Sequence, residues 1–167
     1  PIVAIDKKSH KPGGAANVAL NLSGLGAKVN LIGVAGDDSN YDELQRCFNH
    51  IDNITLHLVK DKTRPTSIKT RIIADGKQVV RLDKEHTNEI GQKQKESLKK
   101  LFNLNISNVD GVIIEDYNKG TLTREIITHI INVGAKKNIP ISQESINLIV
   151  KVCPSITCDL PFISDNL

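Results

Sequence analysis

Apolar residues along the chain switch between two spacings, and these predict alternating helices and strands. Intervals of three and four residues predict helices over 15–25 and from Asp38 or Ser39 to about His50. A β-rich run predicts a strand over 28–34, and apolar–polar alternation predicts a half-buried strand over 54–59. This order, with short connections, is typical of an α/β fold with right-handed crossovers.

The middle of the chain predicts a β-hairpin with polar arms. β-prone runs over 67–74 and 77–82 meet at Asp75-Gly76, which fits a type I′ turn because both turn residues need a positive φ. One face of the hairpin is therefore expected to meet water or a ligand, since charged residues stand among the apolar ones. These charged residues are Lys69, Arg71, Arg81 and Asp83.

The helix–strand alternation resumes after the hairpin. A highly charged helix is expected over 90–102, and a second helix over 122–133. Between them, the continuous apolar run over 109–114 predicts a central parallel strand that is covered on both faces. A further strand starts at 139–141. The pattern as a whole predicts an α/β sheet layered with helices.

Composition narrows the class of protein. The chain has 167 residues, of which 39% are hydrophobic and 25% charged, and its net charge is +3. This small excess of positive charge, spread over segments of mixed sign, argues against a nucleic-acid partner. No apolar run approaches the ~20 residues of a membrane-spanning helix. Three widely spaced cysteines and scattered histidines favour a cytoplasmic protein without a structural metal site.

Two glycines before the first predicted helix mark a candidate binding segment. Gly13 and Gly14 let a ligand approach the backbone and expose N–H groups at the helix start. Asn17 lies one turn further and offers a donor and an acceptor to neighbouring hydroxyl groups. The spacing matches neither a dinucleotide-binding fingerprint nor a Walker A loop. A tight loop followed by an exposed asparagine is the alternative without a binding role.

Three segments of the chain resemble the ribokinase-like (PfkB) carbohydrate kinases. The block over 13–38, with Gly-Gly-Ala-Ala-Asn-Val-Ala at its start, resembles the family's N-terminal signature. The segments over 65–71 with 81–83, and over 115–122, are most similar to the kinase domain of the bifunctional heptose 7-phosphate kinase/heptose 1-phosphate adenylyltransferases. The resemblance covers about residues 1–141.

The resemblance implies a three-layer, Rossmann-like ribokinase fold, of which residues 1–141 form the sugar-binding half. A hairpin over about 62–85 would be the lid, and it would also be a candidate homodimer contact. The implied reaction is ATP- and Mg²⁺-dependent phosphorylation of a sugar phosphate, best matched by D-glycero-D-manno-heptose 7-phosphate at C1, in ADP-heptose and lipopolysaccharide precursor synthesis. The implied substrate-binding residues are Gly13, Gly14, Asn17, Lys69, Arg71, Arg81, Asp116 and Lys119.

The charged candidate residues could also have purely structural roles, without binding a ligand. The lysine and the arginines of the hairpin can grip a phosphate, or they can form the polar face of an edge hairpin. Asp116 and Lys119 follow a buried strand at its carboxyl end, where open α/β sheets bind ligands. Alternatively, Asp116 satisfies backbone donors of its own loop and Gly120 provides the turn.

Two motifs of the family are missing from the sequence. The Gly-Ala-Gly-Asp segment that carries the catalytic base does not occur, and Gly36-Asp37, the one Gly-Asp pair, belongs to the first block. The family's Asn-x-x-Glu magnesium motif is also missing from the later part of the chain, where Val150 stands three residues after Asn147. We therefore expect an incomplete fold, no catalytic or metal-binding residue, a doubtful role for ATP and Mg²⁺, and an inactive chain.

The segment over 142–167 diverges from the family, which continues with Asp-Pro-Lys after Ile141. A frameshifted or degenerate reading frame, a truncated protein and a partial sequence are three explanations that stay open. The alternative to a kinase fragment is a non-catalytic module that binds a sugar phosphate or forms a dimer.

Overall fold

The alternating periodicities of the sequence become alternating helices and strands. The computed structural model describes residues 6–144. The elements are α1 (Ala15–Gly24), β1 (Val29–Gly36), α2 (Ser39–Arg46), β2 (Ile54–Asp61), β3 (Ile68–Ala74), β4 (Lys77–Lys84), α3 (Gln92–Asn105), the 3-10 helix η1 (Ile106–Asn108), β5 (Val112–Glu115), α4 (Arg124–Lys136) and β6 (Ile141–Glu144).

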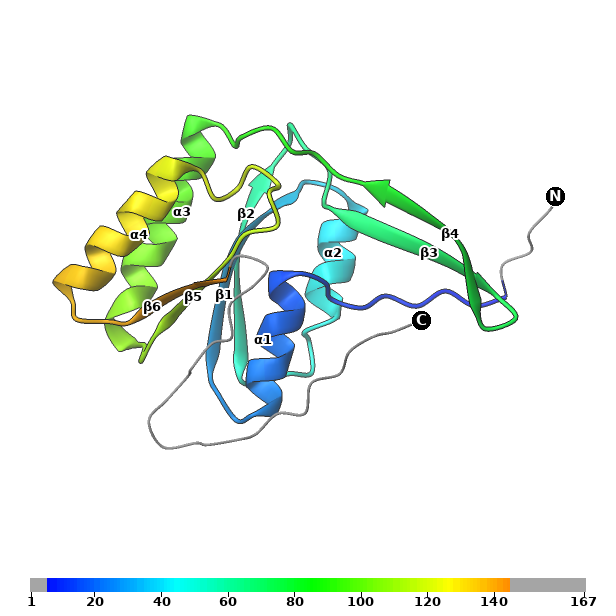
Figure 1. The fold of residues 1–167 in the computed structure, drawn as a ribbon, viewed down its shortest axis with the longest axis horizontal. Coiled ribbons are helices and arrows are strands. Elements are labelled where there is room, and N and C mark those ends of the chain that lie inside the picture. The colour runs from blue at the N-terminus through cyan, green and yellow to red at the C-terminus, as the bar shows by residue number, and fades with distance from the viewer. Residues whose placement is uncertain (1–5, 145–167) are drawn as a thin grey trace.

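The layers follow from which faces of these elements are apolar. Figure 1 shows α3 and α4 on one side of the parallel strands and α1 and α2 on the other. The larger core lies under α3 and α4 and consists of Ile90, Leu98, Phe102, Ile106, Ile114, Ile126 and Ile130. The smaller core lies under α1 and consists of Ala16, Ala19, Phe48 and Ile54. The expected three-layer α/β architecture is confirmed.

Hydrogen bonding divides the described strands into three pairs. β1 and β2 are parallel along their whole length, β5 and β6 are parallel, and β3 and β4 are antiparallel. The strand expected over 109–114 starts only at Val112, because η1 and the turn after it use the preceding residues. Within residues 6–144, β5 has a hydrogen-bonded neighbour on one side, so the central position expected for it is not seen.

The second helix and the tail also differ from expectation. α2 ends at Arg46 rather than near His50, since i→i+3 bonds such as Phe48 N–H to Gln45 O (3.0 Å) tighten the chain and turn the buried Phe48 into the core. The boundary expected between 141 and 142 falls inside β6, because the ladder with β5 continues to Glu115 opposite Glu144. The rest of the tail, and Asn147 with it, lies outside the described residues.

Local signals in the sequence fix the ends of the first two helices. Gly26 (φ +89°) ends α1 in a Schellman motif, in which the Ala27 N–H donates to Leu22 O at 3.0 Å. Asp38 is the N-cap of α2, and its Oδ1 accepts from the N–H groups of Asn40 and Tyr41. Of the two expected caps, Asp38 or Ser39, the structure therefore selects Asp38.

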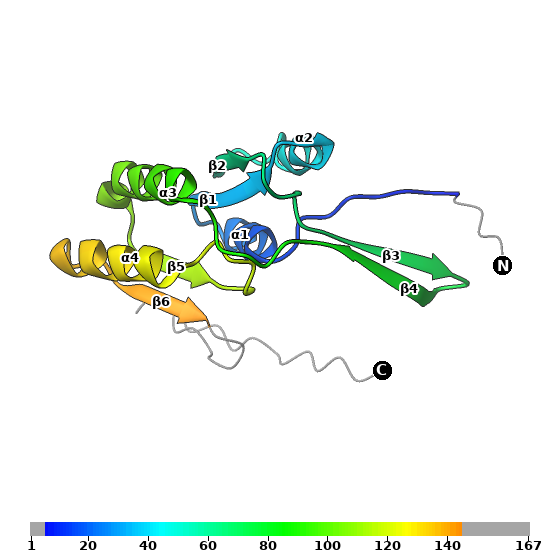
Figure 2. The ribbon, with the colours of Figure 1, turned by 90° about the horizontal axis from the view of Figure 1, so that it is seen from above.

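The hairpin of β3 and β4 extends away from the layered body (Figure 2). Asp75 and Gly76 have φ values of 51° and 74°, which confirms the type I′ turn. Because side chains alternate across a strand, one face of the hairpin is charged and the other apolar. Opposite pairs on the charged face are Lys69 with Asp83 and Arg71 with Arg81, and pairs on the apolar face are Thr70 with Leu82 and Ile72 with Val80.

Candidate functional site

The start of α1 lies against the loop that follows β5. Gly14 has φ +55°, and a Cβ added there would stand 3.3 Å from Cε2 of Tyr117. A side chain at this position would thus be strained and would press on the Tyr117 ring. The glycine pair and the loop over 116–120 are distant in sequence, yet they share one surface.

Gly13 and Asn17 differ from Gly14 because no packed neighbour restricts which side chain could stand at their positions. Nothing lies within 4 Å of a Cβ added at Gly13. Asn17 is exposed, and no hydrogen bond of its side chain occurs within residues 6–144. The helix start offers fewer open donors than expected, since the N–H groups of Ala16 and Asn17 already donate to Gly13 and Gly14 carbonyls at 3.1 and 2.9 Å. What remains accessible is the backbone of Gly13 and the amide of Asn17.

Asp116 shapes its own loop. Its Oδ1 accepts from the Asn118 N–H at 2.8 Å, and Asn118 takes a left-handed φ of 54°. Gly120 (φ +70°) passes so close to the segment leaving the hairpin that an added Cβ would stand 2.0 Å from Asn88 O. The loop is therefore held in a tight conformation against the base of the hairpin.

Three predicted site residues from separate segments meet at that base. Lys69 Nζ donates to Asp83 Oδ2 at 2.8 Å and to Glu85 Oε2 at 3.2 Å. Lys119 Nζ donates to the other oxygen of the same carboxylate, Glu85 Oε1, at 2.5 Å. Arg81 Nε lies 3.0 Å from Asp83 Oδ1. The structure thus brings Lys69, Arg81 and Lys119 together around two carboxylates.

Arg71 stands apart within this cluster. It lies directly across from Arg81 in the β3–β4 register. Like charges at opposed positions of a hairpin destabilise the pair. Unlike Arg81, Arg71 has no carboxylate partner within residues 6–144. The basic cluster, which we define as Lys69, Arg71, Arg81 and Lys119 with the carboxylates of Asp83 and Glu85, keeps two uncompensated positive charges.

The pKa shifts follow these contacts. Hydrogen bonds from Lys119 and then Lys69 hold the pKa of Glu85 below its ordinary value. The hydrogen bond from Lys69 lowers the pKa of Asp83 in the same way. The pKa of Lys69 is raised, chiefly by its hydrogen bonds to Asp83 and Glu85. Glu85, Asp83 and Lys69 therefore keep their charges at neutral pH.

A buried arginine fastens the hairpin to the loop that carries Lys119. The side chain of Arg64 is only 7% exposed, and it pairs through Nε with Asp61 Oδ2 at 3.2 Å. Its Nη1 donates to Lys119 O at 2.8 Å and its Nη2 to Asn88 O at 2.7 Å. One guanidinium therefore joins the end of β2, the segment leaving the hairpin and the loop after β5.

Asp61 and Thr66 complete the attachment of the hairpin. Burial alone would raise the pKa of Asp61, but hydrogen bonds from Thr63 and the charge of Arg64 lower it. Thr66 Oγ1 accepts from the Gly36 N–H at 3.0 Å. A Cβ at Gly36 would stand 2.4 Å from the Thr66 nitrogen. The segment entering the hairpin thus crosses directly against the end of β1.

The sequence pattern did not single out Glu85, Arg64 or Tyr117 as site residues. For Glu85 a signal existed, since Arg81, Asp83 and Glu85 follow at intervals of two and so share one face of an extended chain. Arg64 gave no such signal, because its partners are backbone carbonyls that only the folded chain brings near.

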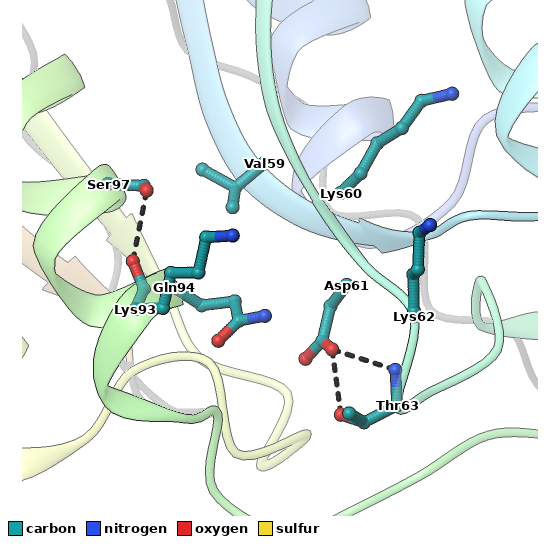
Figure 3. A pocket seen from close by; sticks show the side chains of 8 residues that line it. All are labelled: Val59, Lys60, Asp61, Lys62, Thr63, Lys93, Gln94 and Ser97. Carbon is teal, nitrogen blue, oxygen red and sulfur yellow. Dashed lines mark hydrogen bonds between the residues drawn. The ribbon is translucent and has the colours of Figure 1, made fainter.

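An open cleft of about 270 Å³ lies apart from this cluster, between the end of β2 and the start of α3 (Figure 3). None of the predicted site residues lines it. Of its lining cations, Lys60 and Lys62 pair with Asp37 at 3.2 and 3.9 Å. We therefore place the candidate site at the basic cluster and the start of α1 rather than in this cleft.

Residues 6–144 offer neither a cluster of metal ligands nor a membrane-spanning helix. No group of three or more histidine, cysteine, aspartate or glutamate side chains in this part of the chain could hold a metal ion. None of its helices is long and apolar enough to cross a membrane.

Comparison with known proteins gives one consistent family. The profile described as "pfkB family carbohydrate kinase" matches residues 2–152. The chain is 40% identical over 136 residues to "Bifunctional protein HldE" of Helicobacter pylori strain Shi470, which covers 81% of the chain and 29% of that relative. It is 39% identical over 140 residues to the protein of that name from Sulfurimonas denitrificans, covering 84% and 29%.

A third relative of that name, from Hyphomonas neptunium, is 35% identical over 141 residues, covering 84% of the chain and 29% of the relative. The chain therefore spans about 29% of the length of the curated relatives it matches.

Proposed function

Because the chain belongs to the pfkB family of carbohydrate kinases, we propose that it forms the substrate-binding part of a sugar kinase whose acceptor is a sugar phosphate. The observation that carries the proposal is the basic cluster. Lys69 and Lys119, from a strand and a loop distant in sequence, share the carboxylate of Glu85. Arg71 lies on the same face of the hairpin as Lys69, opposite a second arginine.

The charge of the cluster suits a phosphate. Its four cations and two carboxylates leave an excess of two positive charges, and a phosphate monoester carries about −1.5 to −2 at neutral pH. Arginine offers a planar pair of donors and lysine a point charge. In this proposal Arg71 and Arg81 hold the phosphate with Lys69 and Lys119, and the hairpin over 62–85 is the lid that carries most of them.

The sugar would extend from the cluster toward the start of α1. Lys119 and Tyr117 belong to one loop, and the Tyr117 ring lies where a Cβ at Gly14 would meet it. The backbone of Gly13 and the amide of Asn17 are accessible there and suit hydroxyl groups. Asp116, half-buried in the same loop, would complete this pocket. Holding the acceptor at fixed points is most of what a phosphoryl-transfer site requires of its protein.

For the substrate we propose a heptose 7-phosphate phosphorylated at C1, as in the synthesis of ADP-heptose for lipopolysaccharide. The support is the similarity of the segments over 65–71 and 115–122 to heptose 7-phosphate kinases, and the level of identity to the HldE relatives. We assign residues 1–141 to the sugar-binding half of the kinase domain.

ATP and Mg²⁺ are the cofactors that membership of the family implies. Residues 6–144 do not fit a metal site, because no three ligand side chains converge in them. The sequence also lacks the Gly-Ala-Gly-Asp motif, and the Asn-x-x-Glu at residues 40–43 lies in α2, directly after the first signature block, rather than in the later part of the chain. No step of phosphoryl transfer is therefore derived from these residues, and we propose that the 167-residue chain alone binds sugar phosphate without turning over ATP.

Thermal unfolding of the chain with separate ligands tests this function. A ligand that binds only the folded state raises Tm, and the stabilisation grows with the logarithm of its concentration relative to Kd. Heptose 7-phosphate should raise Tm more than hexose 6-phosphate, and free heptose and ATP with Mg²⁺ should leave it unchanged. Equal shifts by free heptose and its phosphate would contradict the assignment of the basic cluster, and ATP turnover above background would contradict inactivity.

The apolar face of the hairpin supports a second candidate, a dimerisation module. Val80 and Leu82, which lie on this face, are 40% and 55% exposed. An unpaired hairpin with such a face invites pairing with another chain. Sedimentation separates the two candidates: a dimer that Leu82→Lys dissociates, together with no response to any sugar phosphate, would favour the module over the kinase fragment.

A further inference from the structure

Glu85 occupies the centre of the basic cluster. Its two carboxylate oxygens are divided between two lysines, with Oε2 at 3.2 Å from Lys69 Nζ and Oε1 at 2.5 Å from Lys119 Nζ. The Glu85 side chain is 23% exposed, so solvent and solutes reach it. The two ammonium groups thus hold one anion between them, and this anion is supplied by the protein itself.

The two lysines are fixed by different parts of the fold. Lys69 belongs to β3 and keeps a second partner, Asp83, at 2.8 Å. Lys119 belongs to the loop after β5, and Arg64 holds its backbone carbonyl at 2.8 Å. If Glu85 left, the ammonium groups would remain near their positions because their segments are held independently.

Stability alone gives little reason for this arrangement. Exposed ion pairs contribute weakly to folding. A nearby carboxylate, Glu89, pairs with one lysine, Lys95, at 3.2 Å, and Lys95 also lies 3.7 Å from Glu125. In contrast, Glu85 bridges two cations that the proposed function assigns to the substrate phosphate.

We propose that Glu85 determines which anions the basic cluster accepts: it bridges Lys69 and Lys119 in the free protein, and the phosphate of the substrate replaces it there. The inference rests on the proposed function and adds a specificity residue to it. A phosphate dianion carries more charge than a carboxylate and competes for both lysines. A neutral sugar or a singly charged sugar acid lacks this advantage.

Specificity then arises from a competitor inside the protein. Discrimination is a difference between two affinities, and an internal anion lowers the affinity for every ligand group that is weaker than phosphate. Glu85 would thus favour sugar phosphates over free sugars and sugar acids, at some loss of affinity for the phosphate itself.

Calorimetric titration of the full chain with inorganic phosphate and with acetate tests this role. Glu85→Gln removes the competing charge and keeps the shape of the side chain, so it should bind phosphate roughly tenfold more tightly than the wild type. The ratio of phosphate to acetate affinity should fall in the same variant. Glu89→Gln is the matched control, since it removes an equal charge from the Lys95 pair and should change neither quantity.

The sign of the change decides between the outcomes. Unchanged or weaker phosphate binding by Glu85→Gln, with a wild type that binds phosphate, overturns the inference and leaves the proposed function standing. If neither the wild type nor Glu85→Gln binds phosphate or heptose 7-phosphate, both fail. Glu85→Asp gives an independent reading, because the shorter carboxylate bridges both lysines less well and should also tighten phosphate binding.

Discussion

The guanidinium of Arg64 donates through Nη1 to the backbone carbonyl of Lys119 at 2.8 Å, although 55 residues separate the two in the sequence. The same side chain pairs with Asp61 and reaches Asn88 O. It therefore fixes the loop that carries one cation of the basic cluster to the base of the hairpin that carries the others.

Replacement of Arg64 should strongly destabilise the fold. Arg64→Met leaves the Asp61 carboxylate, 1% exposed, without its cation, and removal of one partner of a buried pair costs about 3–5 kcal/mol. Urea unfolding at neutral pH measures the loss. Arg46→Met is the matched control: the Arg46 side chain is 63% exposed in its pair with Glu43, and its loss should change stability by about 0.5 kcal/mol at most. Equal effects of both variants would refute the structural role of Arg64.

The two glycines before α1 should respond differently to alanine. Gly14→Ala must adopt φ +55° and press on Tyr117, so we expect a loss of about 1–2 kcal/mol. Gly13→Ala meets no atom within 4 Å and should leave stability nearly unchanged. If Gly13 borders the sugar, its alanine variant should still weaken heptose 7-phosphate binding by calorimetry. Normal binding by a stable Gly13→Ala variant would remove Gly13 from the site.

Gly120 and Gly76 form a pair that separates backbone strain from steric clash. Their φ values are +70° and +74°, but a Cβ at Gly120 would stand 2.0 Å from Asn88 O, whereas nothing lies within 4 Å at Gly76. Gly76→Ala should cost about 1–2 kcal/mol from strain alone. Gly120→Ala should cost at least about 2 kcal/mol more, because backbone must move. Chemical unfolding of both variants measures the difference. Similar losses of stability would show that the backbone at Asn88 moves away from residue 120 at little cost.

Acid should weaken the fold partly through Asp61. Its pKa in the folded protein lies below the ordinary value of 3.8, so the unfolded chain takes up the proton first as the pH falls. The stabilisation is therefore complete well above pH 3.8 and is lost as the pH falls through the lowered folded value. The Asp61→Asn variant should be less stable than the wild type at pH 7. Between about pH 5 and about pH 3, however, its free energy of unfolding should fall less than that of the wild type. Parallel unfolding curves for both proteins across that range would contradict this origin.

The local sequence was sufficient for most elements of the fold. Asp75-Gly76 specifies its turn through two positive φ values, and Gly26 specifies the end of α1 through one. The apolar spacing of α3 and α4 marks the side chains that meet in the larger core. Errors occur where the core overrides local pattern, as at Phe48, whose burial ends α2 early.

The candidate site was predicted in part. The resemblance to carbohydrate kinases selected Lys69, Arg81 and Lys119, and the structure brings them together. Their role in binding stays a prediction, as do those of Gly13, Gly14, Asn17, Arg71 and Asp116. The sequence pattern did not show that Glu85 lies between two of the lysines, because that position depends on where the hairpin meets the loop after β5.

The sequence by itself determined the alternation of helices and strands, the turn of the hairpin and the family, because spacing, glycine positions and motifs are local along the chain. Only the tertiary structure decided how the charges are matched. Arg64 reaches Lys119 O and Asn88 O, and Glu85 reaches Lys69 and Lys119, across distances that periodicity does not encode. The physical reason is that an ion pair or a buried donor depends on which segments the packed core places side by side.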